Sequence, residues 1–229
     1  MAKILKDIGQ CAIKSEGVEY IFTPSFINLA QLGSPNEIVD KFGYVFDDLA
    51  MVEVSSFKGG FIKRVKLSLR AELALSYSID VLKCCGDKDL PESLIGWFTD
   101  KSYRISNNEC KVPLAEYNLS CRSSGIQPSD IIVIARSLLD FGMIGNSELR
   151  GTSGDGSVDG FNVGAFISFS MSYFGLSKFD ASNLTMIEFQ DIYEMKFPEA
   201  KKAREDDIDL NEANDFFDSI LEMRAAAEA

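Results

Sequence analysis

The sequence predicts a mainly helical α+β fold with a small N-terminal β-hairpin, a bundle-like set of helices and a flexible acidic helix at the C-terminus. Three observations predict this class. Apolar residues recur at three- and four-residue steps over several stretches. Helix caps and glycine stops stand at the ends of those stretches, and strand-prone residues flank a turn early in the chain. We divide the chain into 1–125, with the hairpin and first helices, a helical domain at 126–198, and a tail at 199–229.

The hairpin is expected within residues 10–26. Strand-prone residues lie on both sides of a turn at 15–17. Pro24 closes the second strand, because proline lacks the N–H that a ladder needs. A short helix over 26–32 then ends at Gly33.

A second helix is predicted to begin at Ser34, with Pro35 as its first helical residue and Glu37 three positions after the cap. This is the spacing of a capping box, in which cap and third residue satisfy each other's backbone N–H groups. Gly43 lies inside this helix and weakens it by ~1 kcal/mol relative to alanine. A long helix follows from about Arg64 to Cys85, and its wide apolar arc is typical of a central, buried helix.

Residues 87–113 are polar and predicted to be irregular, and 114–125 receive no secondary structure. The next helix begins at Pro128 and is expected to stop at Gly142, since glycine takes the left-handed conformation at little cost. A glycine-rich loop covers 145–160. The segment 158–174 fits both a helix and a strand, and we favour a helix because the pattern is long.

The last helix of the central region begins with a second capping box, formed by Thr185 and Glu188, and Pro198 stops it. The tail 199–229 carries ten acidic and four basic side chains, half of the net charge of −12. It begins with a charged linker and ends in an amphipathic helix from Leu210. The apolar side of that helix must meet a groove of the chain, a second copy or a partner.

Composition excludes several classes of function. The net charge of −12 argues against nucleic acid and anionic membranes as partners, because both attract positive charge. There is no signal peptide and no apolar run of the ~20 residues that span a bilayer, and five cysteines make a poor disulfide framework. Histidine is absent, which removes histidine-based catalysis and histidine-containing zinc sites. We therefore expect a cytoplasmic protein that is not an enzyme and needs no cofactor.

Two patterns resemble binding sites. Residues 155–160 begin like a calcium loop, but Phe166 stands where the bidentate glutamate is required, so a loop without metal is favoured. One interpretation of the aromatic residues between 161 and 179 is a platform on which nucleic-acid bases stack. Core packing explains them better, because Lys178 is the one basic residue among them. A hydrophobic groove for a protein segment remains the functional alternative.

Two patches of the sequence resemble proteins of tailed bacteriophages. The first is Tyr20-Ile21-Phe22-Thr23-Pro24-Ser25-Phe26 with Leu32-Gly33-Ser34-Pro35 and Glu37-Ile38-Val39. The second is Leu184-Thr185-Met186-Ile187-Glu188-Phe189-Gln190 through Lys196-Phe197-Pro198, which is similar to the closing helix of tail assembly chaperones. Together they cover about a quarter of the chain.

The resemblance implies an acidic, mostly helical protein of the host cytoplasm that binds the tape-measure protein, keeps it soluble and is absent from the finished virion. The expected partner is that protein or another tail protein, with a second copy of the chain as a further candidate. The alternatives are a structural tail or connector component and, with less support, a carboxylate-based hydrolase. The expected protein-binding residues are Phe189, Tyr193, Phe216, Phe217 and Leu221.

Overall fold

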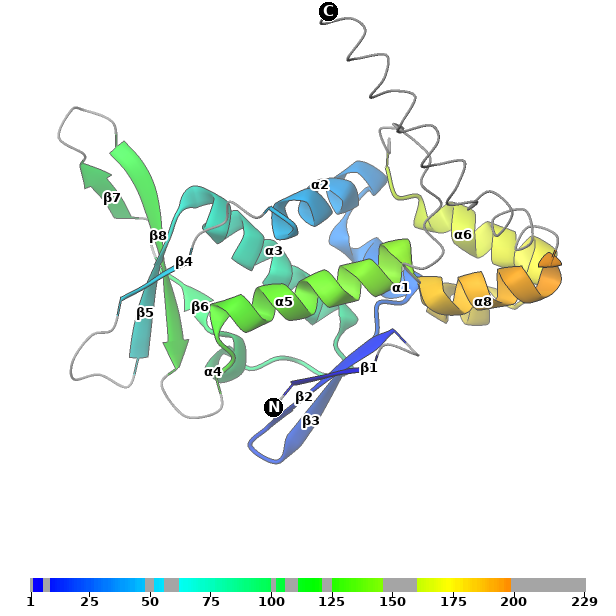
Figure 1. Ribbon diagram of the computed structural model, residues 1–229, viewed down its shortest axis with the longest axis horizontal. Coiled ribbons are helices and arrows are strands. Elements are labelled where there is room, and N and C mark those ends of the chain that lie inside the picture. The colour runs from blue at the N-terminus through cyan, green and yellow to red at the C-terminus, as the bar shows by residue number, and fades with distance from the viewer. Residues whose placement is uncertain are drawn as a thin grey trace, which may run out of the picture.

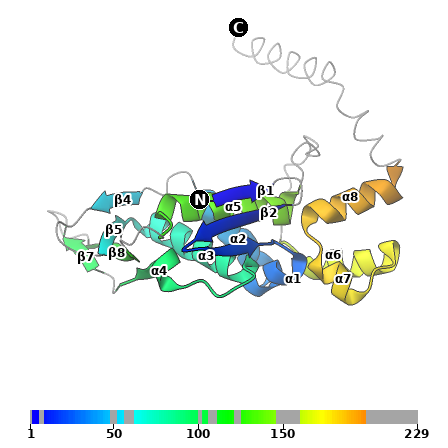
Figure 2. The same cartoon turned by 90° about the horizontal axis from the view of Figure 1, so that it is seen from below.

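The computed structural model of the 229-residue chain describes residues 2–5, 9–47, 52–55, 62–99, 102–105, 111–120, 125–145 and 160–198. Helices occupy the centre, one small sheet lies along their side, and a second sheet lies at one end (Figure 1). The helices of residues 160–198, here called the C-terminal lobe, lie at the opposite end (Figure 2). This arrangement confirms the predicted α+β class, with an N-terminal hairpin followed by helices.

The N-terminal sheet has the order β1-β2-β3 and is antiparallel throughout. Its strands are β1 (Ala2–Leu5), β2 (Gln10–Ser15) and β3 (Val18–Phe22). The β2–β3 hairpin confirms the prediction, and Glu16 and Gly17 both have positive φ, as in the tight turns that match strand twist. Strand β1 was not predicted.

The next elements confirm the predicted helix caps. They are α1 (Phe26–Leu29), η2 (Ala30–Leu32) and α2 (Pro35–Val45). The Ser34 hydroxyl accepts from the Glu37 N–H, and the Glu37 carboxylate accepts from the Ser34 N–H, so the capping box is complete. The hydrogen bond from the Ser34 N–H holds the pKa of the Glu37 carboxyl below its usual value.

A second antiparallel sheet corrects the sequence analysis in two places. Its strands are β4 (Val52–Ser55), β5 (Ile62–Leu67), β6 (Trp97–Phe98), β7 (Ser102–Ile105) and β8 (Lys111–Ser120). The order is β4-β5-β8-β6, and β7 also pairs with β8. The helix expected from Arg64 therefore begins only at Leu69, capped by Ser68. The stretch 87–125, expected to lack regular structure, contains strands β6, β7 and β8. Leu67 is buried in a strand that pairs with β8, about 50 residues away.

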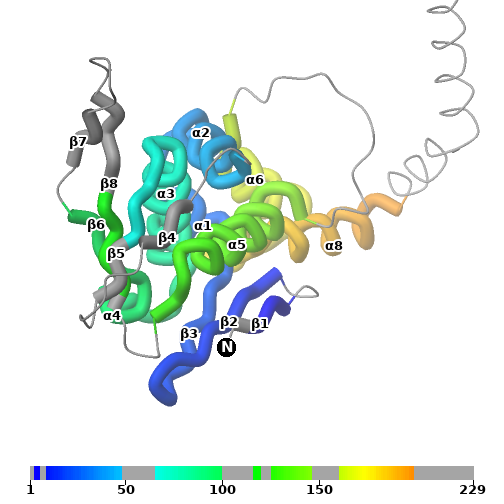
Figure 3. The backbone as a smooth tube through the Cα atoms, turned by 60° about the vertical axis from the view of Figure 1, so that its left-hand side comes forward, coloured from blue at the N-terminus to red at the C-terminus, as the bar shows by residue number. Residues whose placement is uncertain are grey.

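Helix α3 (Leu69–Cys85) is the central helix and packs between α2 and α5 (Figure 3). The short α4 (Glu92–Ile95) precedes β6. Helix α5 (Pro128–Leu139) begins at Pro128 as predicted, but it does not stop at Gly142. It continues as the π-helical turn η3 (Asp140–Ile144), and Gly145, with φ of 80°, ends it. Gly142 is buried, and a Cβ there would approach Pro24 and Leu29 at 2.8 Å, so close packing accounts for this glycine.

The C-terminal lobe contains α6 (Val163–Phe169), the π-helical turn η5 (Ser170–Phe174), α7 (Lys178–Asn183) and α8 (Met186–Lys196). The helical assignment of the ambiguous segment is therefore correct from Val163 onward, and Thr185 and Glu188 form the predicted capping box. No helix in the described part of the chain is both long and apolar enough to cross a bilayer. The loop at 155–159 and the tail from 199 lie outside the described residues.

Candidate functional site

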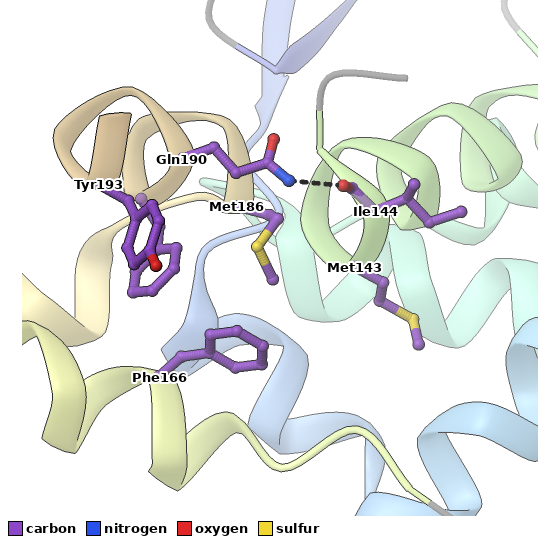
Figure 4. Close-up of a pocket in the computed structure, with 7 residues that line it drawn as sticks. Met143, Ile144, Phe166, Met186, Gln190 and Tyr193 are labelled. Carbon is purple, nitrogen blue, oxygen red and sulfur yellow. Dashed lines mark hydrogen bonds between the residues drawn. The ribbon is translucent and has the colours of Figure 1, made fainter. Parts of the chain in front are cut away.

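An apolar pocket lies where the end of η3 meets α6 and α8 (Figure 4). Its volume is about 300 Å³, at the lower end of the range for ligand pockets. The lining combines two methionines, three aromatic rings and one carboxamide. These residues are Met143, Ile144, Phe166, Met186, Phe189, Gln190 and Tyr193. Methionine side chains adapt their shape to what they contact, so this lining can accept apolar groups of different outline.

One hydrogen bond joins two walls of the pocket. The Nε2 of Gln190 donates to the carbonyl oxygen of Ile144 at 2.9 Å, which joins α8 to the last residue of η3 (Figure 4). Gly145 follows directly, and a Cβ at that position would collide with the Gln190 carboxamide. The positive φ and the close approach both require glycine there.

Both π-helical turns of the described residues pack against α8. Such turns are rare and often occur at functional sites, because the inserted residue redirects neighbouring side chains. Here η3 supplies Met143 and Ile144 to the pocket. In η5, the Ser170 hydroxyl donates to the Phe166 carbonyl at 2.8 Å. This bond links η5 to α6, whose Phe166 ring lines the pocket.

Aromatic rings form a continuous series from the core to the surface of the lobe. Phe26, which is fully buried, stacks on Phe166 with ring centroids 5.3 Å apart. Phe166 meets Phe189 edge-on at 5.3 Å, Phe189 meets Phe169 at 5.7 Å, and Phe169 stacks on Tyr173 at 4.5 Å. Tyr173 is 60% exposed. We call these five rings the aromatic ladder.

Further apolar side chains of the lobe face solvent outside the pocket. Phe179 on α7 is 76% exposed, and Met195 on α8 is 80% exposed. Exposed apolar side chains that gather in one region mark sites of protein contact more often than scattered ones do. The lobe therefore offers a pocket and, elsewhere on its surface, exposed apolar side chains.

Helix α8 carries three carboxylates, Glu188, Asp191 and Glu194. Asp191 is largely exposed. The partial burial of its carboxyl raises its pKa, and the neighbouring charges of Glu194 and Glu188 raise it further. Glu188 belongs to the helix cap. Between residues 160 and 198 the sequence contains four carboxylates and two lysines, Lys178 and Lys196.

The sequence analysis named two residues that the structure brings together here. Phe189 and Tyr193 both line the pocket, and their ring centroids are 6.3 Å apart. The other predicted binding residues, Phe216, Phe217 and Leu221, lie outside the described residues. Sequence reasoning missed Met143, Ile144, Met186 and Gln190, since no local pattern distinguishes them from ordinary core positions.

The structure offers little for other chemistries in its described ranges. No three His, Cys, Asp or Glu side chains there are grouped as a metal site would need. Cys11 and Cys85 are buried free thiols. Burial raises the pKa of Cys11 to about 12 and also raises the pKa of Cys85, so neither is an activated nucleophile.

Comparison with known proteins places the chain in a family. It matches no curated protein and no solved structure. The model of a family of unknown function, DUF6246, matches residues 22–210. That range covers α1 to α8, including every residue of the pocket. Because the match spans most of the chain, the protein belongs to the DUF6246 family.

Proposed function

We propose that this protein is an assembly chaperone of a tailed bacteriophage, which binds a helical segment of the tape-measure protein in the host cytoplasm until the tail tube forms around it. The observation that carries the proposal is the apolar pocket between η3, α6 and α8. The resemblance of residues 184–198 to the closing helix of tail assembly chaperones points to the same helix, α8.

The size and lining of the pocket favour a protein segment as the ligand. A volume of about 300 Å³ holds one or two large apolar side chains rather than a cofactor. Helices that bind in grooves insert such anchor side chains at helical spacing. Anchors that fill a central, desolvated pocket supply most of the binding energy.

A structural tail or connector component is the second candidate. The exposure of Phe179 and Met195 outside the pocket favours it, since a permanent subunit contact would bury such side chains. The two proposals differ in one observable. A chaperone is absent from purified virions, whereas a structural component is present at fixed stoichiometry.

The test is a co-expression pull-down from infected cells with the tagged full-length chain, analysed by mass spectrometry. We expect one very long, helix-rich phage protein to be recovered, and this chain to be missing from purified virions. Tyr193→Ala, in the pocket, should reduce recovery at least tenfold. Met195→Ala, at an exposed position of the same helix, is the matched control. Recovery of tail-tube or head-completion proteins, with this chain in virions, would support the structural role instead.

A further inference from the structure

We infer that Asp87 and Lys88, which follow helix α3, close the outer edge of strand β3, and that without their side chains this edge pairs with β3 of a second copy of the chain. An open sheet edge offers its backbone N–H and C=O groups to any extended segment, so native proteins cover or charge such edges. The inference concerns the N-terminal sheet and does not depend on what binds in the pocket of the C-terminal lobe.

Strand β3 lies at one edge of the N-terminal sheet, whose order is β1-β2-β3. In an antiparallel ladder the backbone groups of every second residue point away from the neighbouring strand. Glu19 and Ile21 are these residues in β3, because the Glu19 carbonyl and both backbone groups of Ile21 bond to residues outside the sheet. Those bonds all go to the short segment after α3.

Asp87 takes the place that a residue of a neighbouring strand would have. Its backbone N–H donates to the Ile21 carbonyl at 2.9 Å, and its carboxylate oxygen Oδ1 accepts from the Ile21 N–H at 2.9 Å. Two residues directly opposite each other in an antiparallel ladder exchange the same two bonds through their backbones. Here a side-chain oxygen replaces one backbone carbonyl, so a further strand has no place opposite Ile21.

Lys88 covers the next outward position of the edge. Its Nζ donates to the Glu19 carbonyl at 2.6 Å and lies 3.6 Å from the Asp87 carboxylate. The same ammonium lies 6.0 Å from the centroid of the Tyr20 ring. A strand that approached Glu19 would have to displace this charged group from all three contacts. Lysine at a sheet edge discourages pairing for this reason.

The side chains of β3 favour pairing, so this edge needs a cover. Val18 and Ile21 are 42% and 38% exposed, and both are β-branched residues of the kind that strands prefer. The opposite edge is protected differently. Strand β1 is only four residues long and carries the exposed Lys3, and both features discourage pairing without a cover.

A second copy of the chain supplies a matching strand. When two β3 strands run antiparallel with Tyr20 at the two-fold axis, Glu19 of one copy lies opposite Ile21 of the other. Each of these pairs can exchange both backbone hydrogen bonds, because the outward groups of β3 belong to these two residues. Glu19 does not face its own copy in this register, so like charges are not directly opposite.

The experiment measures self-association of the full-length chain by sedimentation velocity over a range of concentrations. The double variant Asp87→Ala/Lys88→Ala should associate at least tenfold more tightly than the wild-type chain. Asp87→Asn keeps an oxygen acceptor for the Ile21 N–H and should behave like the wild type. Asp89→Ala removes an exposed carboxylate from the same segment and is the matched control, which should also behave like the wild type.

A third substitution locates the association. Ile21→Pro, added to the double variant, removes an N–H that points away from β2, so the β2–β3 ladder keeps its hydrogen bonds. This triple variant should return to the association of the wild-type chain. Circular dichroism melts show whether each variant retains the fold. If the double variant unfolds, Asp87→Ala alone replaces it in the same comparison.

Two outcomes would overturn the inference. One is wild-type association of the folded double variant, or of Asp87→Ala in its place, at every concentration. The other is stronger association that Ile21→Pro does not reverse, because another surface would then be responsible. Stronger association that Ile21→Pro reverses, with Asp87→Asn and Asp89→Ala unchanged, supports the inference whatever the pull-down recovers.

Discussion

The Gln190 side chain and the Ile144 carbonyl are 2.9 Å apart and hydrogen-bonded, although 46 residues separate them in the chain. The bond closes the end of a π-helical turn, whose last carbonyls have no partner within the helix. It also fixes the position of α8 relative to η3. The contact between these two walls of the pocket therefore depends on Gln190 and on the glycine that lets the two elements approach.

Gly145→Ala should destabilise the fold by about 1–3 kcal/mol, because alanine is strained at positive φ and its Cβ would collide with Gln190. Urea denaturation followed by circular dichroism measures the change. Gly43→Ala is the matched control, since Gly43 lies inside α2 with no atom near the position of a Cβ. That variant should gain up to about 1 kcal/mol. Equal effects of both substitutions would contradict the role of Gly145.

Tyr117→Phe should leave the free energy of unfolding unchanged or raise it by about 1 kcal/mol. The Tyr117 hydroxyl is buried and has no hydrogen-bond partner among the residues that the structure describes, which costs stability that phenylalanine avoids. The ring remains packed edge-on against Phe98, with centroids 5.2 Å apart. Urea denaturation of both proteins is the measurement, and Tyr44→Phe, at an exposed ring, should change nothing. A loss above 1 kcal/mol would reveal a partner for the hydroxyl.

Alkylation should reach Cys84 before Cys11 and Cys85. Burial raises the pKa of all three thiols, but Cys84 is only half-buried, and the thiolate is the form that reacts. Iodoacetamide labelling at pH 8, followed by peptide mass spectrometry, should show at least tenfold slower modification of the two buried thiols. In urea the three rates should converge. Rapid labelling of Cys85 in the native protein would show that the core opens locally.

Asp191→Asn should stabilise the fold slightly at pH 7 and have no effect at pH 3. The folded-state pKa of Asp191 is raised, so its ionisation costs stability as pH rises from the ordinary carboxyl value through the folded one. Asparagine avoids that cost at neutral pH, whereas at low pH the aspartic acid is already neutral. Because Asp191 is exposed, the gain should stay within about 0.5 kcal/mol. Calorimetry at both pH values measures it, and a loss of stability at pH 7 would contradict the sign.

Deleting residues 210–229 should leave the melting temperature nearly unchanged and strongly weaken binding of the client. This follows from the predicted tail helix, whose apolar residues Phe216, Phe217 and Leu221 are expected to contact the client. Differential scanning calorimetry and the pull-down measure the two effects. A large fall in melting temperature would mean instead that the tail belongs to the core.

Local signals account for what the sequence predicted correctly. The capping boxes at Ser34 and Thr185 each lie within four consecutive residues, so their spacing alone predicts them. The second sheet depends on pairs far apart in sequence, such as Val65 with Tyr117. In β8, Pro113 argues against a strand, and the strand forms through pairing with β5, β6 and β7.

The pocket was predictable only in part for the same reason. Phe189 and Tyr193 follow the helical pattern of one segment and were found from it. The opposite wall comes from Met143 and Ile144, and these reach α8 only because the π-helical turn continues past Gly142 to Gly145. A glycine that is buried for packing and one that ends a helix look the same in a sequence.

The aromatic ladder has a mechanical consequence. Its innermost ring belongs to Phe26, whose backbone N–H also donates to the Leu184 carbonyl at 2.9 Å, just before α8. Phe26 directly follows the segment after β3, so the ladder joins the lobe to the base of the N-terminal sheet (Figure 1). Under the proposed function, a client that tilts α8 would displace these rings in turn as far as Phe26, without unfolding any element. Binding of the client in the pocket should then shift the amide resonances of β3, although no residue of β3 lines the pocket.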